Sequence, residues 1–196
     1  MEINIILAGV GGQGILTIAA VIDMAALQSG LTVRQAEVHG MSQRGGAVQS
    51  HLRIADREIY SDLIAEGTAN LILSVEPLEA LRYLPFLAAE GRMVTSTDPF
   101  INMAGYPTME AILVELHRTG QPVLVNAAEL AREAGSVRTS NMIMLGAAAP
   151  FTGLAPEALE AAIGRLFQAK GADIVEMNIR AFRRGKLLSQ QQATAI

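Results

Sequence analysis

The 196-residue sequence predicts an α/β fold, with an open, mostly parallel sheet that carries helices on both faces. Three observations support this prediction. Short apolar runs typical of strands alternate with longer runs of helical periodicity. Several of the apolar runs are uninterrupted, as in strands that are covered on both faces. A glycine-rich segment stands between the first apolar run and the first helical run, which is the order strand, turn and helix of a doubly wound sheet.

The first of these units contains a candidate binding loop. We predict a strand over Ile3–Ala8 and a helix over Gly14–Ser29, joined by the segment Gly9–Gly14. Glycines at such a turn permit a tight bend, a close approach of the backbone to an anion and close packing of helix on strand. The first helical turn directs unpaired N–H groups and the positive end of its dipole at the loop. The candidate binding residues are Gly9, Gly11, Gly12, Gln13 and Gly14.

Three interpretations of this loop remain open. The glycines serve only the packing of the helix, or the loop binds a phosphate or another anion, or it binds a dinucleotide. A dinucleotide needs an acidic residue about 20 positions further on, at the end of the second strand, to hold the ribose hydroxyls. Glu37 meets this requirement, because it lies near the end of the predicted strand Thr32–Val38. NAD is therefore a candidate ligand.

The remaining elements alternate along the chain. The β-like runs Ala47–Ile54 and Glu58–Ser61 are separated by only three residues, so we expect one β-hairpin after the second strand. Later strands are predicted at Leu71–Val75, Arg92–Ser96 and Val123–Asn126. Helices are predicted at Pro77–Leu84 continuing past Pro85 to Ala89, at Thr108–Thr119 and at Ala128–Ala134. Pro85 is expected to kink or restart its helix.

The C-terminal third is expected to be helical throughout. Helices are predicted at Arg138–Ala149, Pro156–Ala169 and Ile174–Gly185. Four glycines that follow helical runs are expected as C-terminal caps, namely Gly30, Gly91, Gly120 and Gly135. The whole pattern predicts one Rossmann-like domain over residues 1–188, followed by a polar, frayed tail over residues 189–196.

The composition argues against several function classes. The net charge is −4 and no block of lysine or arginine exists, which disfavours a nucleic-acid partner. No apolar run reaches the ~20 residues that span a bilayer, and no basic segment precedes the first apolar run as in a secretory signal. The sequence has no cysteine, so it forms no disulfide and offers no thiolate ligand or cysteine nucleophile. A cytoplasmic location is expected.

Apolar residues are frequent and charged residues are scarce. Hydrophobic residues make up 51% of the chain, and charged residues 17% where ~25% is typical. One interpretation is a sheet that is covered on both faces. The other is a surface that a partner normally covers. The two interpretations do not exclude each other.

A second group of candidate functional residues follows the second strand, in segment 37–46. In a doubly wound sheet this loop is expected beside the glycine-rich loop, at the carboxyl edge where ligands bind. His39 titrates near neutrality and is a candidate for proton transfer, although a loop histidine bonded to backbone is the simpler interpretation. Arg44 presents a planar fork suited to a carboxylate or phosphate, and Gln43 is expected at the same rim.

No metal site is predicted. The three histidines His39, His51 and His117 are scattered, and no carboxylate lies at ligand spacing from them. His51 is expected on the polar face of its strand. His117 is expected near the C-terminus of a helix, where a positive charge suits the dipole. Asn141 opens an apolar helix, either as a first-turn cap or as a group that reaches the ligand rim.

Together, these segments resemble the gamma-type subunit of 2-oxoacid:ferredoxin oxidoreductases, and within that family the indolepyruvate type. The resemblance spans nearly the whole chain. It rests on Gly9–Gly14, segment 37–46, Ser50–Ile54, Asn141–Gly146 and Lys170–Asn178. Segment His39–Gly46 is much more specific than the glycine-rich loop.

The resemblance implies a complex that oxidatively decarboxylates 2-oxo acids, transfers the acyl group to coenzyme A and passes electrons to ferredoxin. The thiamine diphosphate and iron–sulfur clusters then belong to a larger partner subunit. This chain lacks the cysteines that hold a cluster and any Gly-Asp-Gly segment for the thiamine cofactor's metal. It then holds no cofactor alone, is inactive alone, and completes a site of the partner.

In this interpretation His39, Gln43 and Arg44 face the partner or its substrate, and the glycine-rich loop takes an anion such as coenzyme A. Dimerisation of the isolated chain through exposed apolar helices is also expected. A second class remains open, a self-contained NAD-binding oxidoreductase or nucleotide-sensing Rossmann module that uses Gly9–Gly14 and Glu37. It differs from the first class in predicting that NAD raises the unfolding temperature of the isolated chain.

Overall fold

The computed structural model describes residues 1–39 and 45–194, and its strands form one open sheet in the order β2-β3-β1-β4-β5-β6. The strands are β1 (Glu2–Val10), β2 (Thr32–His39), β3 (Ala47–Ala55), β4 (Ala69–Ser74), β5 (Leu87–Ser96) and β6 (Val123–Val125). Pairs β1–β4, β4–β5 and β5–β6 are parallel, whereas β3 is antiparallel to both β1 and β2. The predicted α/β class with a mostly parallel sheet is confirmed.

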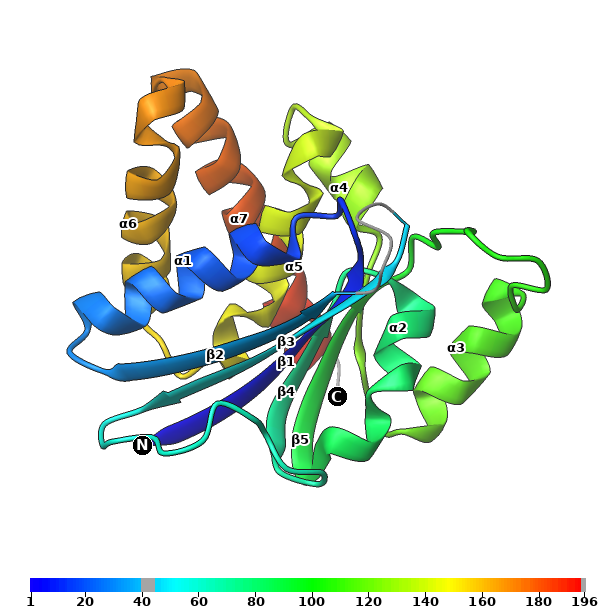
Figure 1. Cartoon of the computed structure of the whole chain (residues 1–196). Helices are drawn as coiled ribbons and strands as arrows, with labels where there is room; N and C mark the ends of the chain where they lie inside the picture. Colours follow the sequence, from blue (N-terminus) through cyan, green and yellow to red (C-terminus); the bar gives the residue numbers. More distant parts are fainter. Residues whose placement is uncertain (40–44, 195–196) are drawn as a thin grey trace.

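Helices cover both faces of this sheet, as predicted (Figure 1). They are α1 (Ile15–Gln28), α2 (Pro77–Arg82), α3 (Met109–Arg118), α4 (Ala127–Glu133), α5 (Ser140–Ala148), α6 (Pro156–Phe167) and α7 (Ala172–Thr194). Short 3-10 turns lie at Leu84–Phe86, Val137–Thr139, Ala149–Phe151 and Gln168–Lys170. Helices α1, α4, α5, α6 and α7 pack on one face, and α2 and α3 on the other. None of the helices in the described ranges is both long and apolar enough to cross a bilayer.

Helix α5 is the centre of the thicker layer. All its residues from Asn141 to Ala148 are buried, which agrees with a sequence that has no continuous polar face. Gly146 and Gly185 let α5 and α7 approach very closely. A β-carbon on Gly146 would lie 1.9 Å from the carbonyl oxygen of Phe182. The C-terminal third is helical, as predicted, because α6 and α7 complete this layer.

The hairpin after the second strand is formed by different residues from those predicted. β2 pairs with β3, with Thr32 opposite Ala55 and His39 opposite Val48. The prediction of a strand at Glu58–Ser61 is wrong, since those residues form no strand. They belong to segment 56–68, which is anchored on the sheet by buried Ile59 and Ile64. The burial of these two isoleucines holds the segment in place, although the segment forms no strand.

Two further boundaries differ from the prediction. The helix from Pro77 does not continue to Ala89, because Pro85 lies in a 3-10 turn and β5 begins at Leu87. Gly91 is accordingly a residue of β5 rather than a helix cap.

The prediction of a frayed tail is also wrong over residues 189–194. Helix α7 continues to Thr194, Ser189 is buried, and the Gln192 side chain donates to the carbonyl oxygen of Leu124 at 3.0 Å. Packing against α5 and β6 orders this polar sequence.

Candidate functional site

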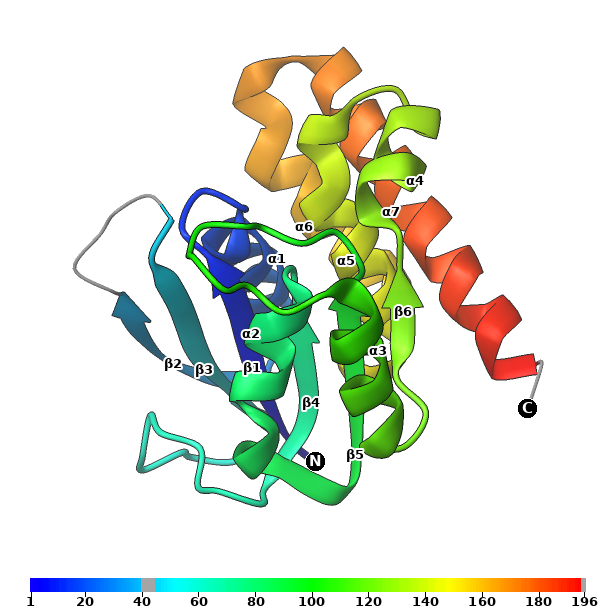
Figure 2. The ribbon, with the colours of Figure 1, turned by 90° about the vertical axis from the view of Figure 1, so that its right-hand side faces the viewer.

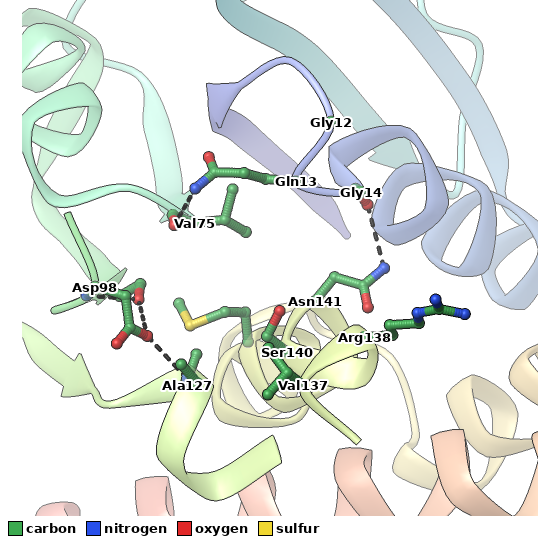
Figure 3. A pocket seen from close by; sticks show the side chains of 13 residues that line it. Gly12, Gln13, Gly14, Val75, Asp98, Ala127, Val137, Arg138, Ser140 and Asn141 are labelled. Atoms are coloured by element: carbon green, nitrogen blue, oxygen red, sulfur yellow. Dashed lines mark hydrogen bonds between the residues drawn. The ribbon is translucent and has the colours of Figure 1, made fainter. Parts of the chain in front are cut away.

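A cavity of about 430 Å³ lies at the carboxyl ends of β1, β4 and β5 (Figure 3). In open α/β sheets this edge is where ligands bind. The cavity is bounded by the loop after β1, the ends of β4 and β5, and the first turns of α4 and α5. The residues that line it are Gly12, Gln13, Gly14, Val75, Ser96, Asp98, Ala127, Ala128, Val137, Arg138, Ser140, Asn141 and Met144.

Gly14 is required by two independent features of this site. Its φ is +81°, a left-handed conformation that side chains rarely adopt. A β-carbon there would also lie 2.6 Å from Nδ2 of Asn141. Asn141 is buried, and its Nδ2 donates to the carbonyl oxygen of Gly14 at 3.4 Å. Asn141 lines the cavity, and it also lies in the first turn of α5, where its Oδ1 accepts from the Met142 amide at 3.0 Å.

The other residues of the glycine-rich loop mainly stabilise its shape. Gln13 accepts from the Val10 amide at 2.8 Å and donates to the carbonyl oxygen of Val75 at 3.4 Å. Gly11 exchanges backbone hydrogen bonds with Gly45 and Gly46, at 3.4 and 2.9 Å. Of the five predicted residues, three line the cavity, whereas Gly9 and Gly11 do not.

The start of α1 leaves backbone donors available beside the cavity. The amides of Gly14, Ile15 and Leu16 make no hydrogen bond to another described residue, and α1 has no side-chain cap. Free amides at the positive end of a 14-residue helix attract anions. This arrangement fits a phosphate or a carboxylate.

The opposite wall is fixed by Asp98. Oδ2 of Asp98 accepts from the Ser96 hydroxyl at 2.9 Å and from the Ala128 amide at 2.8 Å. This carboxylate therefore caps α4 and is already engaged on its Oδ2. These two bonds fix the orientation of Asp98, which forms one wall of the cavity.

Arg138 is the one cationic side chain that lines the cavity within the described residues. It is exposed and forms no ion pair with a described residue. Figure 3 shows its side chain directed away from the centre of the cavity. An unpaired guanidinium at the rim suits the phosphate of a ligand that extends out of the cavity.

The second predicted cluster is only partly described. His39 is the last residue of β2, whereas Gln43 and Arg44 lie outside the described residues. Gly45 and Gly46 are bonded to Gly11, so the described residues just before β3 lie beside the glycine-rich loop. Strand β3 lies between β1 and β2, which sequence analysis did not predict.

This strand order argues against a dinucleotide at the loop. Glu37 is separated from β1 by β3 and does not line the cavity, which extends toward β4 and β5 instead. Glu37 accepts from the Gln35 side chain at 2.6 Å. It also lies near Asp23 of α1, whose pKa is raised to about 6 by burial and by the charge of Glu37. Sequence analysis did not identify Asp23, because no local pattern shows that its side chain is half-buried.

The described histidines have structural roles. His51 is buried, its Nδ1 accepts from the Ile64 amide at 3.1 Å, and burial lowers its pKa. His51 does lie on the same face of β3 as Arg53, but segment 56–68 covers this face, so the histidine is buried. His117 lies in the last turn of α3, as predicted. Within the described residues, no group of three potential ligand side chains is placed to hold a metal ion.

Comparison with known proteins identifies the family. Residues 4–188 match the family model described as pyruvate ferredoxin/flavodoxin oxidoreductase. The chain belongs to this family. It is 40% identical over 194 residues to the indolepyruvate oxidoreductase subunit IorB of Pyrococcus horikoshii, covering 94% of each chain. It is 39% identical to IorB of Archaeoglobus fulgidus, also over 94% of each chain. The resemblance found in the sequence is thus confirmed.

Solved structures of oxoacid oxidoreductases share the fold. One is the 2-oxoglutarate:ferredoxin oxidoreductase of Magnetococcus marinus, solved with 2-oxoglutarate, coenzyme A and succinyl-CoA. Its TM-score is 0.76 at 20% identity, with 97% of this chain and 31% of that chain covered. The fold of this chain is therefore about a third of a longer polypeptide there.

Sequence analysis missed several cavity residues of this family member. Ser96, Asp98, Val137 and Arg138 were not proposed as site residues, although Asp98 lies two residues after the end of β5. A polar residue after an apolar strand was the available signal. Arg138 had no such signal, because its position depends on how α4 and α5 meet.

Proposed function

We propose that this chain is the small subunit of a ferredoxin-dependent 2-oxoacid oxidoreductase of the indolepyruvate type. The observation that carries the proposal is 40% identity to IorB over nearly the full length of both chains. The complex would oxidatively decarboxylate indolepyruvate or a related aryl 2-oxo acid. The acyl group passes to the thiol of coenzyme A, carbon dioxide leaves, and two electrons pass to ferredoxin.

The chain's own part in this reaction is to complete a site, and not to hold the redox cofactors. An iron–sulfur cluster held by cysteines does not fit this chain, because its sequence contains none. The thiamine diphosphate and the clusters are therefore assigned to a larger subunit. The proposal includes a cytoplasmic location, since ferredoxin must reach the complex.

The cavity beside α1 is proposed as the position where a phosphate-bearing part of coenzyme A binds. Support comes from the free amides of Gly14, Ile15 and Leu16 and from the unpaired guanidinium of Arg138. His39, Gln43 and Arg44 are proposed to face the larger subunit or its substrate. This chain would bind and orient the ligand and exclude water, and the bond-breaking steps belong to the thiamine cofactor.

Reconstitution tests this function. The isolated chain is expected to be colourless and to show no 2-oxoacid oxidation. Together with the cognate subunit that carries the clusters, it should support reduction of ferredoxin that depends on both indolepyruvate and coenzyme A. The control is the larger subunit alone, which should be inactive or nearly so. Turnover of a 2-oxo acid by this chain alone would contradict the proposal.

The alternative function, a self-contained NAD-binding enzyme, has little support from the geometry. It requires Glu37 beside the glycine-rich loop, and β3 lies between them. Family membership also favours the subunit role.

A further inference from the structure

Two walls of the cavity leave the sheet from neighbouring strands. Val75 follows β4, and its carbonyl oxygen accepts from the Gln13 side chain, so this wall holds the glycine-rich loop. Ser96 ends β5, and Asp98 belongs to the β5–α3 loop, which we define as residues 97–108. The paired residues of β4 and β5 end just before Val75 and Ser96. Backbone pairing within the sheet therefore does not fix the separation of these two walls.

The side chain of Glu76 bridges the two segments beyond the sheet. Its Oε1 accepts from the Phe100 amide at 3.3 Å and from the Tyr106 hydroxyl, both in the β5–α3 loop. Its Oε2 accepts from the Glu79 amide at 2.8 Å, in the first turn of α2. Figure 2 shows the β5–α3 loop at the carboxyl end of the sheet, next to α2. One carboxylate thus joins the segment after β4 to the segment after β5.

Glu76 is a buried acidic side chain that no cation neutralises. It is only 1% exposed, and within the described ranges it forms no ion pair with a lysine or an arginine. A buried carboxylate is costly unless hydrogen-bond donors surround it. A carboxylate suits this position because both of its oxygens accept, and donors approach it from α2 and from the β5–α3 loop.

The capping of α2 does not by itself require this buried charge. Thr108 caps α3 and Asn126 caps α4, and both are neutral, exposed side chains. The charge of Glu76 instead strengthens its bonds to the β5–α3 loop, because charge-assisted hydrogen bonds are the stronger kind. Burial and the bond to Glu76 raise the pKa of Tyr106, so its hydroxyl remains a donor at neutral pH.

The bridge reaches the cavity through short stretches of backbone. Val75 precedes Glu76 directly, and Phe100 lies two residues after Asp98. Asp98 in turn accepts from the Ala128 amide at 2.8 Å, in the first turn of α4. A displacement of the β5–α3 loop would therefore move one wall of the cavity relative to the other.

We infer that Glu76 is a positioning residue, which sets the separation of the two cavity walls without lining the cavity itself. This inference deepens the proposed function and rests on it, because the ligand of the cavity is taken to be coenzyme A. A binding site must be held to within about 0.5 Å by the residues that support it, and a displacement of about 1 Å can cost about 10²-fold. Loss of the bridge should weaken the binding of coenzyme A more than it slows the chemical steps.

The first test severs the bridge in the complex assembled with the cognate cluster-bearing subunit. Glu76→Ser keeps a favoured cap for α2, but its short side chain does not reach Phe100. We expect the KM for coenzyme A to rise at least about fivefold, and kcat at saturating coenzyme A to stay within about twofold. The KM for the 2-oxo acid should not change.

The matched control for the first test is Thr108→Ala. It removes the cap of α3, where the Thr108 hydroxyl accepts from the Ala111 amide at 3.3 Å, and Thr108 does not line the cavity. Both variants are expected to lower the unfolding temperature, whereas only Glu76→Ser should raise the KM for coenzyme A. The control therefore separates positioning of the cavity walls from a general loss of stability.

The second test is Tyr106→Phe, which removes one donor to Glu76 but keeps its charge and the cap of α2. It decides the question even if Glu76→Ser does not fold. The KM for coenzyme A should rise about two- to threefold, because one of the two bonds to the loop remains. Hydrogen exchange of the isolated variant should accelerate in residues 97–106 and not in α3.

The outcomes separate this inference from the proposed function. If the wild-type complex depends on coenzyme A and both Glu76→Ser and Tyr106→Phe keep its KM, the role of Glu76 is wrong and the function stands. An equal rise of the KM in Thr108→Ala also overturns the inference, because the effect would follow from lost stability. If the wild-type complex does not require coenzyme A, the proposed function fails and this inference with it.

Discussion

At the residue scale, the surroundings of Asp23 disfavour the negative charge of its carboxylate. Its Oδ1 is buried without a hydrogen-bond partner, and burial together with the charge of Glu37 raises its pKa from 3.8 to about 6. The native chain therefore binds a proton more tightly than the unfolded chain does. The contribution of this group to stability is present below about pH 4 and is lost as the pH rises through about 6.

We predict that Asp23→Asn stabilises the protein at pH 8 by about 1–2 kcal/mol, after allowance for partial exposure of the site. The asparagine keeps the shape of the side chain and removes the unfavourable charge. Urea unfolding at pH 8 and pH 4.5 measures the effect, and the gain should fall to about a third at the lower pH. A gain of equal size at both pH values would show that charge is not its cause.

At the element scale, the contact between α5 and α7 has the least tolerance for added volume. A β-carbon on Gly146 or on Gly185 would lie 1.9 Å from a carbonyl oxygen of the opposite helix. Backbone atoms cannot rotate away as a flexible side chain can, so the helices would have to separate. The close approach also carries the C-terminal part of α7 to β6.

Gly146→Ala is therefore expected to destabilise the chain by about 3 kcal/mol or more. The matched control is Gly164→Ala in α6, where a β-carbon meets nothing within 4 Å. That variant should be neutral or stabilising by up to about 1 kcal/mol, since alanine has the higher helix propensity. Thermal unfolding of the two proteins gives the comparison. Similar losses of stability in the two variants would contradict a close contact between α5 and α7 at Gly146.

At the scale of the whole molecule, the proposed anion site lies in a chain that is negative overall. The net charge is −4, so long-range attraction does not assist an anionic ligand. Binding then depends on the local donors at the start of α1 and on Arg138, which act over a few ångströms.

We expect coenzyme A to raise the unfolding temperature of the isolated chain, and NAD at the same concentration to leave it unchanged. Arg138→Ala should reduce the shift with coenzyme A, because it removes the cation at the rim. Arg132→Ala is the control, since Arg132 is also exposed but does not line the cavity. Protection by NAD that is lost in Glu37→Ala would instead support the alternative function.

The glycine-rich loop was largely predictable from the sequence, and the cavity around it only in part. Gly14 and Gln13 were found because a strand, a turn and a helix follow one another within a few residues. Asp98 and Arg138 were missed because they come from segments far along the chain. The burial of His51 was not predicted, because alternation along a strand assigns a face but not the loop that covers it.

The sequence by itself determined the α/β class, the helical C-terminal third and the position of the glycine-rich turn, since these follow from local periodicity and backbone preference. Only the tertiary structure decided which strands are neighbours, that β3 separates Glu37 from the glycine-rich loop, and that Glu76 bonds to Phe100 and Tyr106. Such pairings depend on contacts between residues distant in sequence, whose energies no local pattern records.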